Sequence, residues 1–374
     1  MKTRKMAKIC FVSLNAYPLL KKIDKGFVGG REKQLVEIAK ELENRGYEII
    51  FLTYGKKYNQ LEIHENIKIY HTYEREKVNE LSFFKKMIYI WEKLKVIDAD
   101  VYIYGSGSPG IISVYTRLLR KKSIYSISSD ADVTTKIIIK NNNFSGFMSK
   151  IGTFIDLFLS DYVLTQNNFQ QEKIKSLKKS KIVKSAINLT SADTKTKDSL
   201  IWIGTIREIK QPKLFLKIAQ IFPDYNFIMI GGIGENQKLY DSIKNNSKKY
   251  PNLNFKGFVP QYEINKYYKR AICLISTSLT EGFPNVFLES WNFQVPVVSL
   301  NIDPDGIIKK YSMGYHSRTF DQMVKDINKI LENEELRECM GKNGRRYVEK
   351  NHSTKIITDK YEKIIDEILL SKLD

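Results

Sequence analysis

Residues 271–300 read AICLISTSLTEGFPNVFLESWNFQVPVVSL and contain the elements of one β-α-β unit. Residues 272–276 and 295–300 are short apolar runs, typical of buried parallel strands. Between them a polar turn reaches Pro284, a residue that favours the start of a helix because its missing N–H would have no partner there. A strand, turn, helix and strand in this order predict a parallel sheet covered by helices.

The same alternation extends over most of the chain. Further buried strands are predicted at residues 9–12, 49–53, 101–104, 123–127, 200–204, 226–231 and 254–258. Apolar residues have helical spacing at 31–44, where Gly46 then predicts a helix end, and again at 111–119. We therefore expect an α/β protein with two Rossmann-like, doubly wound domains facing an interdomain cleft.

The domain boundaries follow from composition. The polar stretch 190–199 separates the two strand–helix series and predicts a linker. The domains are therefore expected at about 1–190 and 199–355. Residues 354–370 have apolar residues at helical spacing and predict a last helix that can pack on either domain, including back on the first.

Composition limits the class of protein. Of 374 residues, 42% are hydrophobic and 28% charged, which is sufficient for two apolar cores. No run approaches the ~18 apolar residues of a membrane-spanning helix, and the N-terminal sequence MKTRKMAKICFVSL lacks the features of a signal peptide. Cys10, Cys273 and Cys339 show no disulfide spacing. These features predict a soluble protein of a reducing compartment, most simply the cytoplasm.

The formal net charge of +19 is unevenly distributed. Residues 1–200 carry 35 Lys and Arg against 21 Asp and Glu, whereas residues 201–374 carry 26 against 21. Such a surface favours nucleic acid, an anionic membrane or phosphorylated substrates, although a generally Lys-rich composition also explains it. Segments 81–95 and 115–122 combine apolar and basic residues and can lie on an anionic membrane. For 81–95 we favour a half-buried core helix with a solvated Lys face.

The segment 276–291 is the richest in chemistry. Glu281 lies in its turn and Glu289 on its helix, so both carboxylates can project toward one ligand. The first backbone N–H groups of the helix, at residues 285–287, form an anion site suited to a diphosphate. Carboxylates beside such a site suit sugar and ribose hydroxyls. Two glutamates at this spacing occur easily by chance, and the surrounding EGFPNVFLE strengthens the signal.

This segment resembles the E-x7-E signature of glycosyltransferase family 4, whose members are retaining enzymes with the two-domain GT-B fold. The resemblance extends over nearly the whole chain. GGREKQL at 29–35 is similar to the family's N-terminal glycine loop, GTIREIKQP at 204–212 to its G-R-x4-K segment, and GFV at 257–259 to the loop that lines the nucleotide base.

The resemblance implies a role for each matching residue. Glu289 would hold the ribose hydroxyls, Glu281 would contact the transferred sugar, and Lys210 with Arg207 would neutralise the departing diphosphate. The other implied donor-binding residues are Gly282, Phe283, Pro284, Asn285, Val286, Gly29, Gly30, Gly204, Phe258 and Val259. No metal or other cofactor is then expected, because fixed cations and a helix N-terminus stabilise the leaving group. Glu281 is not assigned as a covalent nucleophile.

The chain also departs from the family pattern. Thr205 stands where an Arg normally follows the glycine, so Arg207 is expected to replace it. NIDPDGI at 301–307 replaces a G-G-x-x-E segment, which removes the usual basis for phosphate contacts there. A histidine after the fourth strand is missing. In its place lie Asp130 and Asp132, either of which can orient the acceptor or cap the following turn.

The sequence thus predicts a retaining hexosyltransferase that uses a nucleotide diphosphate sugar. The first domain would bind a saccharide or lipid-linked saccharide acceptor and the second the donor. The expected setting is surface polysaccharide, lipopolysaccharide or capsule assembly at the inner face of the cell membrane, with peripheral contact to anionic lipid. A nucleotide-sugar epimerase or a phosphorylase of the same fold is the alternative, but would need acid/base groups or a phosphate or cofactor site that we do not find.

Binding classes are less well supported. A basic nucleic-acid-binding protein would need a recognition module, and no such pattern is present. GGIG at 231–234 lacks the third glycine of a nicotinamide-binding motif. The four histidines are scattered without metal-ligand spacing, so no metal site is expected.

Overall fold

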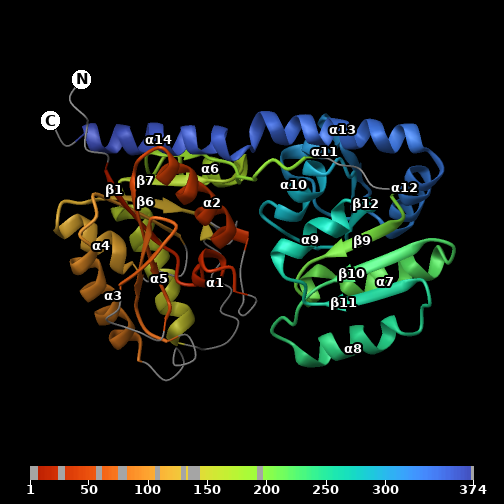
Figure 1. Cartoon of the computed structure of the whole chain (residues 1–374), viewed down its shortest axis with the longest axis horizontal. Coiled ribbons are helices and arrows are strands. Elements are labelled where there is room, and N and C mark those ends of the chain that lie inside the picture. Colours follow the sequence, from red (N-terminus) through yellow and green to blue (C-terminus); the bar gives the residue numbers. More distant parts are fainter. Residues whose placement is uncertain are drawn as a thin grey trace. The chain divides into compact units, whose positions relative to one another are not determined.

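The computed structural model describes residues 7–23, 30–55, 61–74, 82–105, 110–127, 132–133, 144–191 and 197–371. The chain divides into two compact units (Figure 1). The first comprises residues 1–186 together with 354–374, and the second comprises residues 187–353. Each is built on a mainly parallel sheet with helices around it, which confirms the α/β fold class expected from the sequence.

The sheet of the first unit has eight strands in the order β3-β4-β2-β1-β5-β6-β7-β8. Their bounds are β1 (Lys8–Val12), β2 (Glu48–Thr53), β3 (Leu61–His64), β4 (Ile67–His71), β5 (Val101–Gly105), β6 (Lys122–Ser126), β7 (Tyr162–Thr165) and β8 (Ser180–Ile182). The β3–β4 pair is antiparallel, whereas the other pairs are parallel. From β1 the chain winds first toward β4 and then toward β8, so helices cover both faces.

The helices of this unit are α1 (Tyr17–Leu20), α2 (Gly30–Asn44), α3 (Phe83–Ile97), α4 (Ile111–Leu118), α5 (Phe144–Leu159), α6 (Asn168–Ile174) and α14 (Thr354–Leu370). Helix α2 ends as expected, because Gly46 has a φ of +94° and its N–H bonds to the carbonyl of Glu43. On one face, α2 and α14 bury apolar side chains against β1 and β2. On the other, α3 and α4 bury Ile90, Leu94 and Ile112.

The last helix, α14, contributes to the core of the first unit. Tyr361 and Ile365 are buried among residues of α2 and the first strands. Arg45, directly after α2, donates to the carboxylates of Asp359 at 2.7 Å and Glu362 at 2.6 Å. Helix α14 therefore completes the core of the unit that contains β1 and α2.

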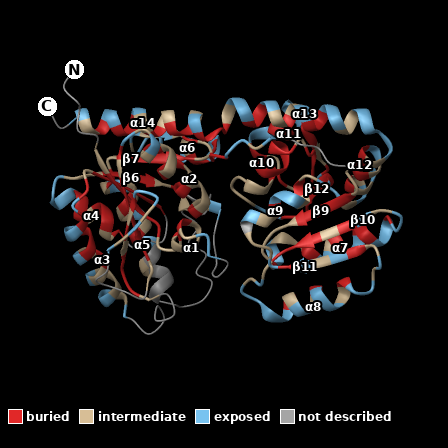
Figure 2. Ribbon diagram, viewed as in Figure 1, coloured by how far each residue is buried: buried red, intermediate tan, exposed pale blue. Residues whose placement is uncertain are grey.

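The second unit has a parallel sheet of six strands in the order β11-β10-β9-β12-β13-β14. The strands are β9 (Ser199–Ile203), β10 (Asn226–Ile230), β11 (Leu253–Gly257), β12 (Ala271–Ser276), β13 (Val297–Ser299) and β14 (Gly314–His316). The central strands β9 and β12 are almost entirely buried (Figure 2). Apolar clusters lie on both faces, as a sheet covered on both sides requires.

The helices of the second unit are α7 (Pro212–Ile221), α8 (Gln237–Ser247), α9 (Gln261–Tyr268), α10 (Asn285–Asn292), α11 (Ile307–Lys310), α12 (Phe320–Glu332) and α13 (Glu334–Asn351), with short 3-10 turns η2 (Glu208–Lys210) and η3 (Pro304–Gly306). Helices α10 and α13 pack closely. A Cβ added to Gly344 on α13 would lie 2.5 Å from Cδ1 of the buried Trp291 on α10. None of the helices in the described ranges is long and apolar enough to cross a membrane.

Candidate active site

The donor-binding segments predicted in the second unit lie at the carboxyl ends of neighbouring strands. Gly204 follows β9, Phe258 follows β11, and the turn 277–284 follows β12. Since the strand order is β11-β10-β9-β12, these loops are adjacent along one edge of the sheet, where ligands of such sheets bind. The loops are also joined directly, because the N–H of Leu279 donates to the carbonyl of Ile209 at 2.8 Å.

Lys210 and Glu281 form an ion pair on this edge, between Nζ and Oε1. The same carboxylate oxygen accepts a hydrogen bond of 2.8 Å from Oγ of Ser278. The two side chains are 23% and 17% exposed, so the pair is partly shielded from water. Two residues that the sequence selected from separate motifs are thus brought into contact.

Behind this pair lies a connection that the sequence analysis missed. Oγ1 of Thr277 donates to the backbone carbonyl of Lys210 at 2.7 Å and accepts from Nε1 of Trp202 at 3.0 Å. Thr277 is fully buried. Its hydroxyl therefore fixes the backbone of Lys210 relative to β9 and β12. The sequence signal was a polar residue directly after an apolar strand, which alone is weak.

Glu289 has a different partner. It lies on α10, is 9% exposed, and accepts a hydrogen bond of 2.9 Å from the hydroxyl of Tyr268. Burial, together with the negative charge of Glu289, raises the pKa of Tyr268 well above its ordinary value. The Tyr268 ring stacks on Phe293, with 5.7 Å between ring centroids. Tyr268 thus holds the Glu289 carboxylate in place, and sequence reasoning had not selected it.

The start of α10 differs in detail from the expectation. Pro284 is the capping residue and the helix begins at Asn285. The N–H of Phe287 donates to the carbonyl of Pro284 at 3.0 Å, so this amide is already used and the expectation that it contributes to the anion site was wrong. Gly282, Phe283 and Val286 are half-buried around this turn.

The remaining donor-site candidates in this unit lie along the same edge. Nη2 of Arg207 is 3.1 Å from a carboxylate oxygen of Glu235, which follows β10, and its side chain is 40% exposed. Phe258 is 57% exposed and lies against Gly232, whereas Val259 packs against the core. An exposed aromatic ring at the end of β11 is suited to stacking on a flat base.

In the first unit, the predicted residues are described only in part. Gly29 and Asp130 lie outside the described residues. Gly30 is the exposed first residue of α2. The next residue, Arg31, reaches the end of β5, where a Cβ on Gly105 would lie only 2.7 Å from its Nη1 atom. The start of α2 therefore lies at the carboxyl edge of the first sheet.

Asp132 is half-buried near the same edge. Burial raises the pKa of Tyr125 on β6; the negative charges of Asp132 and Asp156 raise it further, and the positive charge of Arg31 lowers it. These groups are therefore neighbours. The structure thus brings Arg31 and Asp132, one from each of the two predicted acceptor segments, to the same part of the first unit.

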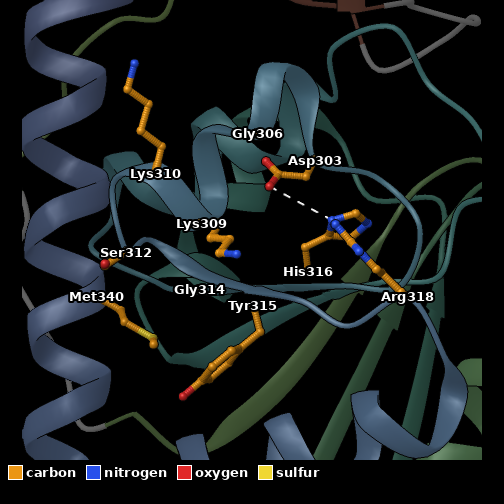
Figure 3. Close-up of a pocket in the computed structure, with 10 residues that line it drawn as sticks. All are labelled: Asp303, Gly306, Lys309, Lys310, Ser312, Gly314, Tyr315, His316, Arg318 and Met340. Carbon is orange, nitrogen blue, oxygen red and sulfur yellow. Dashed lines mark ion pairs between the residues drawn. The ribbon is translucent and has the colours of Figure 1, made fainter.

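A cavity of about 890 Å³ lies beside β14 and the segment 301–307 (Figure 3). It is lined by Asp303, Gly306, Lys309, Lys310, Ser312, Gly314, Tyr315, His316, Arg318 and Met340. Oδ1 of Asp303 accepts the N–H of Ile308 at 2.8 Å, so the segment 301–307 caps its own turn. No group of three His, Cys, Asp or Glu that could hold a metal ion is found within the described part of the chain.

Residues 189–347 match the family model described as "Glycosyl transferases group 1". The chain is 22% identical over 360 residues to an uncharacterized glycosyltransferase of Haemophilus influenzae, covering 91% of this chain and 96% of that protein. It is 30% identical over 108 residues, or 28% of each chain, to the capsular polysaccharide biosynthesis glycosyltransferase CapM of Staphylococcus aureus.

The crystal structure of Anabaena HepE in complex with UDP-glucose has a TM-score of 0.71 to this chain at 13% identity, covering 96% of this chain and 100% of that one. This likeness shows the fold. The chain thus has the GT-B fold, its second unit matches the group 1 glycosyl transferases, and these similarities together identify it as a glycosyltransferase enzyme.

Proposed function

We propose that the chain is a retaining hexosyltransferase that moves a sugar from a nucleotide diphosphate sugar to a saccharide or lipid-linked saccharide in cell-surface polysaccharide assembly. The observation that carries this proposal is the Lys210–Glu281 pair at the carboxyl edge of the second sheet. The UDP-glucose bound to HepE and the polysaccharide role of CapM support the donor and the setting.

Donor binding would begin with an exchange of ionic partners. In the structure the Lys210 ammonium is neutralised by Glu281. A diphosphate brings more negative charge than one carboxylate, so Lys210 would turn to it and leave Glu281 to accept hydrogen bonds from sugar hydroxyls. Glu289, held by Tyr268, would accept from the ribose hydroxyls.

The chemical step would depend on electrostatics and positioning. The bond between the anomeric carbon and the diphosphate oxygen breaks, and the acceptor hydroxyl attacks the same face of the sugar. Its proton passes to the departing phosphate oxygen. Lys210, with Arg207, would stabilise the charge that develops on the leaving diphosphate, so we propose that no metal is required.

The acceptor would bind on the first unit. Asp132 and Arg31 both lie near Tyr125 at the carboxyl edge of that sheet. A carboxylate there can orient an acceptor hydroxyl, and the guanidinium can bind an anionic group of a charged acceptor. The excess of basic residues in the first 200 positions favours acceptors that carry phosphate or acidic sugars.

The test is a thermal-shift panel of nucleoside diphosphates and their sugars without metal. A ligand present at 100 times its Kd stabilises the folded chain by about 2.7 kcal/mol. We expect one nucleotide to raise the midpoint of the wild type and of Glu334→Ala, an exposed control on α13, but not that of Glu289→Ala. If no donor stabilises the wild type, or if Glu289→Ala responds fully, the proposed donor site is wrong.

Retention needs a separate measurement. With the donor known, the anomeric configuration of the product is read by NMR before it can equilibrate. A product with the same configuration as the donor sugar supports the proposal, and an inverted product contradicts it. Activity that persists in a chelator supports the metal-independent step, whereas activity restored only by a divalent cation overturns that part.

A further inference from the structure

Exposed apolar side chains are concentrated on one face of the first unit. Of the 22 large hydrophobic side chains that are exposed in the described residues, ten lie on α3 to α6 or in the turns that follow them. Each of these helices connects one strand to the next in the series β4, β5, β6, β7 and β8. The five strands follow one another in one direction across the sheet, with β2 and β1 lying between β4 and β5. Right-handed crossovers therefore place all four helices on one face of the sheet.

Four of these exposed residues form what we call the α4–α6 patch: Leu118 at the end of α4, Phe154 and Phe158 on α5, and Leu177 after α6. They are 66%, 63%, 46% and 58% exposed. The two phenylalanine rings are in contact, with 4.5 Å between centroids. Since exposed apolar side chains usually occur singly, such a group indicates a contact surface.

Three contacts hold these helices together beneath the patch. Oγ of Ser113 on α4 donates to the buried carboxylate of Asp156 on α5 at 2.7 Å. A Cβ added to Gly110, at the start of α4, would lie 2.9 Å from Cγ2 of Ile155. After α6, Nζ of Lys178 donates to the carbonyl of Phe158 at 2.8 Å. The patch is therefore formed by firmly packed elements.

Basic side chains surround the patch. Arg117 and Arg120 flank Leu118, and Lys150 lies on α5 one helical turn from Phe154; all three are exposed. Burial lowers the pKa of Lys178; the negative charge of Asp161 raises it and the positive charge of Arg117 lowers it, so one acidic and one basic group lie near this lysine.

We propose that the α4–α6 patch is the surface by which the chain lies on an anionic lipid bilayer. Phe154, Phe158 and Leu118 would enter the boundary between headgroups and acyl chains, while the surrounding cations would contact lipid phosphates. A second copy of the chain fits less well, because a two-fold contact would bring the same positive charges together. The inference rests on the proposed function and deepens it, since a lipid-linked acceptor would be presented at such a surface.

The test is flotation of the full chain with phosphatidylcholine vesicles that contain either no anionic lipid or about one-third phosphatidylglycerol. We expect binding to the anionic vesicles only, weakened by salt. The variant Phe154→Ser/Phe158→Ser should reduce binding about tenfold, and Arg117→Gln/Arg120→Gln by a similar factor. Ile63→Ser is the matched control, because Ile63 is 64% exposed on the edge strand β3 and should bind like the wild type.

The outcomes separate this inference from the proposed function. The same proteins are assayed for the nucleotide-induced thermal shift, which all variants should retain because their substitutions are exposed and belong to the first unit, whereas the donor motifs belong to the second. If the wild-type chain binds a nucleotide but no anionic vesicle, the proposed bilayer contact is wrong and the proposed donor site stands. The bilayer contact is also wrong if the Phe154→Ser/Phe158→Ser variant binds anionic vesicles as well as the wild type does, or if Ile63→Ser loses as much binding as that variant. A dimer in sedimentation velocity that this variant dissociates would assign the patch to a second copy.

Discussion

Replacing Glu281 by Gln should change nucleotide binding and turnover in opposite directions. In the structure the Glu281 carboxylate forms an ion pair with the ammonium of Lys210, so a diphosphate that binds Lys210 must replace this carboxylate. Gln has nearly the same volume and can still accept the hydrogen bond of Ser278, but it carries no charge. We therefore expect Glu281→Gln to bind a nucleoside diphosphate more tightly. Turnover should fall, because a neutral amide stabilises positive charge at the anomeric carbon less than a carboxylate does.

The magnitude follows from the exposure of the pair. Unit charges about 4 Å apart interact by ~4 kcal/mol at an effective dielectric constant of 20. The Lys210 and Glu281 side chains remain 23% and 17% exposed, and for accessible pairs competition from water reduces the net value to about 1 kcal/mol. That corresponds to a roughly fivefold lower Kd for the nucleoside diphosphate. The loss in kcat should be larger, about 100-fold.

Isothermal titration calorimetry without metal measures the affinity, and steady-state kinetics measure turnover. Glu208→Gln is the matched control, because Glu208 is an exposed acidic residue in the same turn as Lys210. It should leave both values nearly unchanged. Unchanged or weaker binding by Glu281→Gln would refute the exchange of ionic partners. Equal tightening in Glu208→Gln would show a general effect of charge.

Three further predictions concern other residues of the second unit. Thr277→Val removes the hydroxyl that holds the carbonyl of Lys210, so it should lower the free energy of unfolding by about 2 kcal/mol and lower kcat more than it raises KM. Thr277→Ser, which keeps the hydroxyl, should restore both stability and kcat. An unchanged kcat in Thr277→Val would contradict the positioning role. Burial lowers the pKa of Lys197 from 10.5 to about 8, so its charge destabilises the folded state below pH 8 and this effect disappears as the pH rises toward 10.5. In urea denaturation, the free energy of unfolding of the wild type should rise from pH 7.5 to pH 9.5, and that of Lys197→Met should rise less. An equal rise in the two proteins would contradict this prediction. Gly344→Ala would place a methyl group against the buried Trp291, and thermal denaturation should show a loss of about 1–3 kcal/mol, whereas wild-type stability would show that α13 can shift freely.

The sequence predicted those strands that are continuously apolar. Residues 49–53 and 272–276 are such runs, and they form β2 and β12. The hairpin of β3 and β4 was missed although LEIHENIKIYH alternates apolar and polar residues, because its two-residue turn, Glu-Asn, lacks the glycine that usually marks such a hairpin. Glu65 and Asn66 in that turn have φ of +47° and +63°, as a tight hairpin requires. The edge strand β14 spans only three residues, which is too short for any periodicity.

For the site, local motifs indicated which residues lie at the carboxyl ends of strands, because a motif is contiguous in sequence. They did not indicate which residues pair, since pairing depends on strand order. β9 and β12 are neighbours in the sheet although two strands separate them along the chain, and this brings Lys210 to Glu281. Trp202 and Tyr268 were missed because a buried aromatic residue whose polar atom supports a functional group resembles any core residue in sequence.

The return of α14 to the first unit has a consequence for biosynthesis. The first and last residues of the second unit, Ile187 and Ser353, form a β-bridge. All residues of that unit's core are therefore present once residue 353 has been synthesised. The first unit, although translated earlier, lacks Tyr361 and Ile365 until the last helix has emerged from the ribosome. The later-translated half can therefore finish folding first, and the nascent N-terminal half must remain soluble with part of its core uncovered.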